Sequence, residues 1–488
     1  MKNKNREGKL IERKDPELRY NLITRRLPGN VLARPGNVDT TDWFKNISEK
    51  GEQRKKDPNS IMNRAKNKDN WFCIHPFAEM FVEIDGYYQA CCLAKKNYKN
   101  NISNTPFKSW MEDSEYMNGI RKEMLNPAKD FKDNKFINKY CVRCVKDEKR
   151  YGKSRRTYTM WKDSNNPEFW DNIERIAREY EETGKYKFKE NNRICQIQLK
   201  AFGVECNLDC HMCLHENSSM RMDMVKKHNL WNTKVFGPLN STLKKYKNVA
   251  DNLTKIDIKD VINQVCELGP YLRSIKIIGG EPLIMKQYYQ LLDAVIESGH
   301  AKDIIIKFQT NLTKLVAGKH KFINYIPHFL NISFTVSIDG VGKYQDYCRR
   351  RGVWEEIEDN IDLVNDPKFK DKAYVDVNSV ITCLNVLRYY KVIDYCNNHP
   401  GVRSIGWLMI EWPKALRVNN LPDKLKNNLI PKYEGFPDIQ SALKMPPCED
   451  NDFQETINYL LKQDEAYKGT KWEMHLFDVF PELKEFAK

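Results

Sequence analysis

Six strand-like segments alternate with helical segments between residues 194 and 412, and this alternation restricts the possible folds more than any other feature. The six segments are apolar and rich in β-branched residues, and they lie at 194–199, 274–278, 303–309, 331–338, 374–382 and 404–410. Apolar residues recur between them at helical spacing, for example at Leu291, Leu292, Val295 and Ile296. Consecutive parallel strands need long crossovers, usually helical. The pattern therefore predicts an α/β fold with a parallel sheet, either open or closed into a barrel.

The remaining sequence divides by composition and periodicity into regions on either side of this unit. The N-terminal region is polar and broken by Pro and Gly, and a cysteine-rich region follows it. A helical linker and then the α/β unit come next, and irregular chain with one helix near 452–462 ends the sequence. The predicted boundaries are 1–68 for the leader, 69–160, 161–193, 194–412 and 413–488.

Composition and charge exclude several classes of protein. Of the 488 residues, 41% are hydrophobic and 30% are charged, which is typical of a soluble globular protein. No apolar run approaches the roughly 20 residues of a membrane span, and the N-terminus lacks a secretory signal pattern. We therefore expect a cytoplasmic protein without membrane association, whose 14 cysteines serve metal binding or catalysis rather than disulfide formation.

The net charge of +15 is concentrated near the N-terminus. Residues 1–70 contain 18 basic and 10 acidic side chains. Two interpretations stay open for this region: a partly disordered, solvated leader, or an arm that makes weak contact with a polyanion.

The most specific motif is a group of three cysteines that follows the first predicted strand. Cys206, Cys210 and Cys213 have the spacing C-x3-C-x2-C, in a position where parallel α/β folds build active sites. Three thiolates on a [4Fe–4S] cluster leave one iron without a protein ligand, and an open position on a metal is where substrate or cofactor binds. A zinc site completed by His211 or His215 is the alternative.

A second motif follows the second predicted strand. The segment is Gly279-Gly280-Glu281-Pro282. Paired glycines permit close approach of a ligand, and the carboxylate is suited to accept hydrogen bonds from an ammonium group. Alone, the segment is equally consistent with a tight turn into a helix.

With both motifs in this order, residues 194–410 resemble a radical S-adenosylmethionine (radical SAM) enzyme with a partial (β/α)6 barrel. The resemblance implies that Cys206, Cys210 and Cys213 hold three irons of a [4Fe–4S] cluster. It also implies that S-adenosylmethionine chelates the fourth iron, with its amino group at the Gly279–Pro282 turn. Asn311, Ser337 and Asp339 then become expected contacts to the cofactor. Arg349, Arg350 and Arg351 either pair with its carboxylate or form a solvated cationic face, the reading we expect for at least two of them.

Four cysteines before the barrel form a second group, Cys73, Cys91, Cys141 and Cys144. Their surroundings resemble the twitch (half-SPASM) domain, which implies an auxiliary [4Fe–4S] cluster. The better-known members carry this domain after the barrel, whereas here it comes first. Cys92 is an alternative ligand to Cys91, because adjacent strand residues point to opposite faces. A zinc site made of the same four thiolates is an alternative to the cluster.

The resemblance implies an enzyme that reductively cleaves S-adenosylmethionine to a 5′-deoxyadenosyl radical and abstracts hydrogen from a substrate. A peptide or protein side chain is the expected substrate, with small molecules as the other possibility, and an external electron donor is required. Two alternatives are an RNA-modifying radical SAM enzyme and a non-catalytic iron–sulfur or zinc protein that binds nucleic acid. The turn at Gly279–Pro282 argues against the non-catalytic reading, because a purely structural metal protein does not need it.

Overall fold

The structure is a computed structural model that describes most of the chain. The described residues are Ile61 and the ranges 71–151, 154–157, 167–189, 193–236, 238–448 and 453–487. Apart from Ile61, the leader at 1–68 and its predicted polyanion contact lie outside them.

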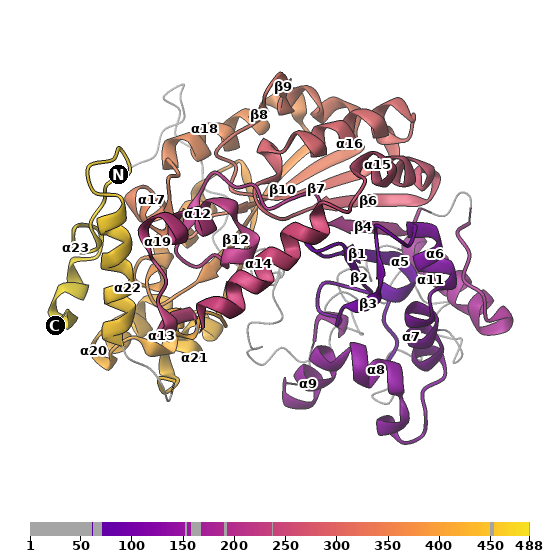
Figure 1. Cartoon of the computed structure of the whole chain (residues 1–488), viewed down its shortest axis with the longest axis horizontal. Helices are drawn as coiled ribbons and strands as arrows, with labels where there is room; N and C mark the ends of the chain where they lie inside the picture. Colours follow the sequence, from indigo (N-terminus) through magenta and orange to yellow (C-terminus); the bar gives the residue numbers. More distant parts are fainter. Residues whose placement is uncertain are drawn as a thin grey trace.

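A nine-stranded sheet with the order β13-β12-β10-β7-β6-β4-β1-β2-β3 forms the centre of the molecule (Figure 1). Its first six strands in that order pair in parallel and correspond to the six segments predicted from the sequence. They are β4 (Cys195–Leu199), β6 (Leu272–Ile277), β7 (Ile305–Thr310), β10 (Asn331–Ser337), β12 (Ala373–Ile381) and β13 (Val402–Met409). Neighbours in the sheet are neighbours in sequence, as a partial (β/α)6 barrel requires. The predicted α/β class and parallel sheet are confirmed.

Amphipathic helices cover the outer face of this sheet (Figure 1). The main ones are α15 (Ile258–Glu267), α16 (Lys286–Glu297), α18 (Trp354–Val364) and α19 (Tyr389–Asn398). In α18, Trp354, Ile357, Ile361 and Val364 are buried, so one stripe of the helix faces the core. The crossover from β7 to β10 instead contains 3-10 turns and a short hairpin of β8 (Val316–Ala317) with β9 (His320–Lys321).

The cysteine-rich region joins the same sheet. Strands β1 (Glu79–Val82), β2 (Tyr87–Gln89) and β3 (Asn97–Asn101) pair in antiparallel order, while β1 pairs in parallel with β4. Short helices surround these strands, namely α5 (His75–Ala78), α6 (Phe107–Asp113), α7 (Glu115–Leu125), α8 (Lys135–Tyr140) and α9 (Val142–Tyr151). The region is therefore hydrogen-bonded to the barrel sheet through backbone pairing.

The linker and the C-terminal region pack against opposite ends of this architecture. The predicted bridging helix is α11 (Pro167–Thr183), and the predicted C-terminal helix is α22 (Phe453–Ala466). Figure 1 shows α11 beside the cysteine-rich region and α22 at the other end of the molecule. Within the described residues, no helix combines the length and apolar character needed to cross a bilayer.

Candidate active site

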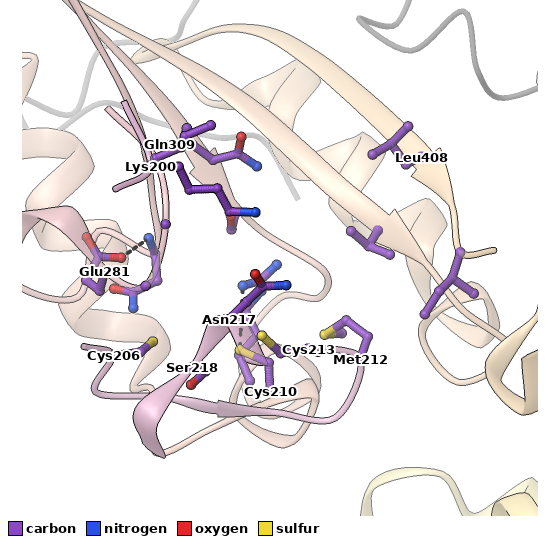
Figure 2. Close-up of a pocket in the computed structure, with 18 of the residues that line it drawn as sticks. Lys200, Cys206, Cys210, Met212, Cys213, Asn217, Ser218, Glu281, Gln309 and Leu408 are labelled. Carbon is purple, nitrogen blue, oxygen red and sulfur yellow. Dashed lines mark hydrogen bonds between the residues drawn. The ribbon is translucent and has the colours of Figure 1, made fainter. Parts of the chain in front are cut away.

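A cavity of about 650 Å³ lies at the carboxyl ends of the parallel strands. Residues at or directly after the carboxyl ends of β4, β6, β7, β10, β12 and β13 line it, so every barrel strand contributes. Among the predicted site residues, Cys206, Cys210, Cys213, Gly279, Gly280, Glu281, Asn311 and Ser337 line this cavity. Figure 2 shows the three thiols gathered on one side, with Lys200 and Gln309 across the cavity from them.

The three cysteines sit in a protected loop. Burial raises the pKa of Cys206 to about 12 and also raises the pKa of the Cys210 and Cys213 thiols. The positive charge of the Arg349 guanidinium acts in the opposite direction and lowers the pKa of the Cys210 thiol. Arg349 Nη1 donates a hydrogen bond to Cys210 Sγ at 3.6 Å. Buried thiols with a cation at hydrogen-bond distance suit a metal centre, because a metal supplies the positive charge that thiolates need. The donor set therefore fits a cluster held by three cysteines.

A buried charge network holds the cysteine loop in place. Asp209 and Arg221 are both fully buried, and Arg221 Nη1 donates to Asp209 Oδ1 at 2.7 Å. Arg221 also donates to Gln463 Oε1 at 2.8 Å and contacts the Tyr459 hydroxyl, while Tyr467 donates to Asp209 Oδ2 at 3.0 Å. Because three of these partners come from the C-terminal region, that region supports the cysteine loop.

The loop backbone is held by a second partner. Strand β5 (Asp209–Cys210) pairs in antiparallel order with β11 (Arg349–Arg350). At least two of the three arginines at 349–351 were expected to form a solvated face, and the structure contradicts this expectation. Arg350 is 1% exposed and pairs with Asp464 of α22. Arg349 points inward as well, toward Asp339 and Cys210.

The glycine turn after β6 needs both of its glycines. Gly279 and Gly280 have φ values of +99° and +50°, which side-chain-bearing residues rarely adopt. A Cβ atom on Gly280 would lie 2.2 Å from the carbonyl oxygen of Glu205. The Glu281 amide donates to that same carbonyl at 2.7 Å. The turn thus packs directly on the chain that leads into the cysteine loop.

The Glu281 carboxylate joins neighbouring strand ends. It accepts hydrogen bonds from the Leu283 amide at 3.1 Å, the Thr310 hydroxyl at 2.5 Å and the Asn311 amide at 2.6 Å. Burial raises the pKa of Glu281 to about 7, although these donors act in the opposite direction. Glu281 therefore positions the residues that follow β7 in addition to lining the cavity.

The other predicted cofactor contacts differ in whether they line the cavity. Asn311 donates to Asn207 Oδ1 at 3.0 Å, which ties its strand end to the cysteine loop. Asp339 is fully buried, outside the cavity lining, and accepts from Arg349 Nε at 2.8 Å and from the Val380 amide at 2.7 Å. Pro282 is also buried and begins a 3-10 turn. The Asp339 carboxylate is therefore already hydrogen-bonded to protein groups.

The second cysteine group surrounds a small separate cavity. Cys73, Cys91, Cys141 and Cys144 all line it, whereas Cys92 does not. Burial raises the pKa of Cys73 to about 12 and raises the pKa of the other three thiols. Arg155 lines the same cavity, and its buried Nε has no hydrogen-bond partner in the described part of the chain. Four buried thiols beside an orphaned guanidinium nitrogen fit an anionic thiolate-ligated group.

A zinc ion is the alternative occupant of this cysteine group. Tetrahedral zinc needs four donors that converge on one point, about 2.3 Å from each sulfur. Across the residues that the structure describes, no three Cys, His, Asp or Glu side chains are grouped closely enough to hold one metal ion. The same holds for Cys206, Cys210 and Cys213, so this observation does not separate a zinc ion from a cluster.

Sequence reasoning missed the residues that connect the two cavities. Leu93 lines both, and Arg143, which lies between Cys141 and Cys144, lines the larger one. Arg143 pairs across the fold with Glu411, which follows β13. Lys200 and Trp412 are further lining residues that the motifs do not mark. The position of Arg143 within the CxxC segment was the one available signal.

Comparison with known proteins identifies a domain in the central part of the chain. Residues 201–386 match the Radical SAM superfamily, and this segment contains both the cysteine loop and the glycine turn. The chain therefore contains a radical SAM domain, and that superfamily implies a [4Fe–4S] cluster and S-adenosylmethionine. No curated protein sequence matches the chain.

Several solved structures are similar to parts of the chain. "Native anSMEcpe with bound AdoMet and Cp18Cys peptide" is 16% identical, with a TM-score of 0.31, and the match covers 50% of this chain and 61% of that one. Streptococcus suis SuiB bound to precursor peptide SuiA is 12% identical, with a TM-score of 0.33, and the match covers 80% of this chain and 77% of that one. The chain thus spans about three fifths of the anSMEcpe protein.

Proposed function

We propose that the protein reductively cleaves S-adenosylmethionine and uses the resulting radical to abstract hydrogen from a peptide or protein side chain. The observation that carries this proposal is the convergence of three motif cysteines and the glycine turn on one cavity at the strand ends. When bound, a reduced [4Fe–4S] cluster supplies the electron that cleaves S-adenosylmethionine. The protein's task is to bind, orient and exclude water from the reacting groups.

The residues have distinct proposed roles. Cys206, Cys210 and Cys213 would ligate three irons, and Arg349 would stabilise the charge on the Cys210 sulfur. The backbone of Gly279 and Gly280 would receive the cofactor's amino group, because glycine allows a ligand to approach closely. Glu281 would hold Asn311 in position through its amide. An external electron donor completes the requirement for reductant.

The second cysteine group is proposed to hold an auxiliary [4Fe–4S] cluster, with Cys91 rather than Cys92 as a ligand. The four thiols around one cavity and the orphaned Arg155 nitrogen support this proposal. A peptide substrate rests on the sequence resemblance to twitch-containing enzymes. The adjacency of the two cavities at Leu93 would let a substrate lie between the two clusters.

The direct test is reductive cleavage by the reconstituted protein without substrate. Dithionite-reduced wild-type protein should form 5′-deoxyadenosine and methionine slowly, as measured by liquid chromatography. Cys213→Ala should abolish the products, since two thiolates remain for the cluster. Cys266→Ala is the matched control, because Cys266 is half-buried on α15 away from both cavities. Equal cleavage by Cys213→Ala and wild type would refute the assignment of the loop.

A further inference from the structure

The mouth of the large cavity carries a charged pair contributed by two distant parts of the chain. Arg143 comes from the CxxC segment of the cysteine-rich region, and Glu411 follows the last barrel strand. Arg143 Nη2 donates to Glu411 Oε1 at 2.7 Å, and Nη1 donates to Glu411 Oε2 at 3.2 Å. This is the two-pronged geometry with which arginine recognises carboxylates. The protein therefore already presents a carboxylate-binding fork at this place.

A hydrogen bond within α9 fixes the orientation of the Arg143 guanidinium. Arg143 Nε donates to Asp147 Oδ2 at 3.1 Å, one helical turn further along α9, and Asp147 is buried. Arg143 is the second residue of α9, where a positive charge is opposed by the helix dipole. The i,i+4 pair with Asp147 offsets this effect within the helix, and the two remaining guanidinium nitrogens are directed at Glu411 in the wall of the cavity.

The Glu411 carboxylate occupies the position in which a ligand carboxylate would bind to Arg143. Its side chain is 59% exposed and that of Arg143 is 39% exposed, and ion pairs this exposed contribute little to stability. Arg417 donates twice to the Glu411 carbonyl oxygen, at 2.8 and 2.9 Å, so the backbone at this point is held.

The other cations of the cavity pair with carboxylates that lie outside the cavity lining. Arg349 pairs with Asp339 at 2.8 Å, and Lys200 lies 3.4 Å from both oxygens of Glu83. Beside Arg143 and Glu411, Trp412 is 46% exposed and provides an apolar surface at the mouth.

From this arrangement we propose that Arg143 is a specificity-determining residue that binds a glutamate or aspartate side chain of an acidic peptide substrate. The substrate carboxylate displaces Glu411 from the fork, and the adjoining peptide lies against Trp412 and Leu93, between the two cavities. This inference rests on the proposed function, whose substrate class it specifies. A free dicarboxylate offers the same chemistry, and the experiment separates it from a peptide.

The test is calorimetric titration of the reconstituted, S-adenosylmethionine-bound full chain with three probes. They are acetyl-Ala-Ala-Glu-Ala-Ala-amide, its Gln counterpart and free glutarate. Wild type should bind the Glu peptide at least about tenfold more tightly than the Gln peptide, because one charge-assisted bidentate contact distinguishes them. Arg143→Gln should abolish this preference, and Arg143→Lys should keep only part of it, because lysine lacks the fork.

The variant Glu411→Gln distinguishes substrate binding by Arg143 from a purely structural ion pair between Arg143 and Glu411. Loss of the competing carboxylate should strengthen binding of the Glu peptide several-fold, whereas a latch would leave binding unchanged. Lys314→Gln is the matched control, since Lys314 forms a similarly exposed pair with Glu356 on α18. It should leave the preference at the wild-type value.

Three results would overturn the proposal: equal affinity of wild type for the Glu and Gln peptides, no measurable binding of the Glu peptide, or an unchanged preference in Arg143→Gln. Equal affinity for glutarate and the Glu peptide would overturn the assignment of a peptide. Reductive cleavage by wild type without probe tests the proposed function separately. A failure of the peptide-binding proposal and a failure of the proposed function are therefore distinguishable.

Discussion

The buried pair of Asp209 and Arg221 allows a quantitative test of how the cysteine loop is held. Asp209 lies between Cys206 and Cys210, and both members of the pair are fully buried at 2.7 Å. Asp209→Asn keeps the shape of the side chain but leaves the Arg221 charge without its counter-ion. Removing one partner of a buried pair costs about 3–5 kcal/mol. We therefore expect a large loss of stability from a nearly isosteric change.

Urea denaturation followed by tryptophan fluorescence measures this loss. With a denaturant dependence of about 3 kcal/mol per molar, the loss of about 3–5 kcal/mol should lower the midpoint by about 1–1.7 M. Glu356→Gln serves as the control, because its pair with Lys314 is 42–49% exposed and contributes less than about 1 kcal/mol. Its midpoint should stay within about 0.3 M of wild type.

The same variant should lose iron from the barrel site. Iron per reconstituted chain should fall from about eight toward about four, since the loop that carries three ligands is no longer fixed. An Asp209→Asn protein with the wild-type midpoint and full iron content would show that the pair does not hold the loop, and the reasoning would be wrong.

Three further outcomes are expected. Gly280→Ala should keep the overall fold by circular dichroism but lose S-adenosylmethionine binding in a filter assay, because its Cβ would lie 2.2 Å from the Glu205 carbonyl oxygen; wild-type affinity would contradict the tight turn. Burial raises the pKa of Glu281 from 4.5 to about 7, so the folded state favours the protonated carboxyl. The stability that this group contributes is complete below pH 4.5 and is lost as the pH rises through 7. The melting temperature of Glu281→Gln relative to wild type should therefore increase between pH 5.5 and 8, and a constant difference would contradict the raised pKa. The double variant Cys141→Ala with Cys144→Ala should lose about half of the iron while retaining cleavage of S-adenosylmethionine; full iron in a soluble double variant would remove these thiols from the ligand set.

The sequence predicted the barrel well because its signals are local. Each parallel strand is a short apolar run, and the helix stripe of Trp354, Ile357, Ile361 and Val364 is buried as its spacing indicates. The cysteine loop and glycine turn were found for the same reason, since each is a contiguous motif. Their common cavity followed from the rule that strand ends share one edge of a sheet.

The features that the sequence did not predict depend on partners far apart in the chain. Nothing local marks Asp209 as the partner of Arg221, or Gln463 and Tyr467 as their neighbours. At least two of the three arginines at 349–351 were expected to be solvated, because a run of charged residues usually is. The burial of Arg350 depends on Asp464, more than 100 positions later. Likewise, a four-residue strand such as β1 carries no sign of which strand it will pair with.

The pairing of β1 with β4 has a consequence for the newly made chain. Glu79 on β1 receives a hydrogen bond from Gln198 on β4, which is synthesised 119 residues later. Until β4 leaves the ribosome, the segment Glu79–Val82 has an open apolar edge that is fully buried in the finished protein. Such an edge is a template for pairing with other chains. The cysteine-rich region cannot complete its sheet during the early part of translation, so its protection from aggregation depends on the speed with which the first barrel strand follows.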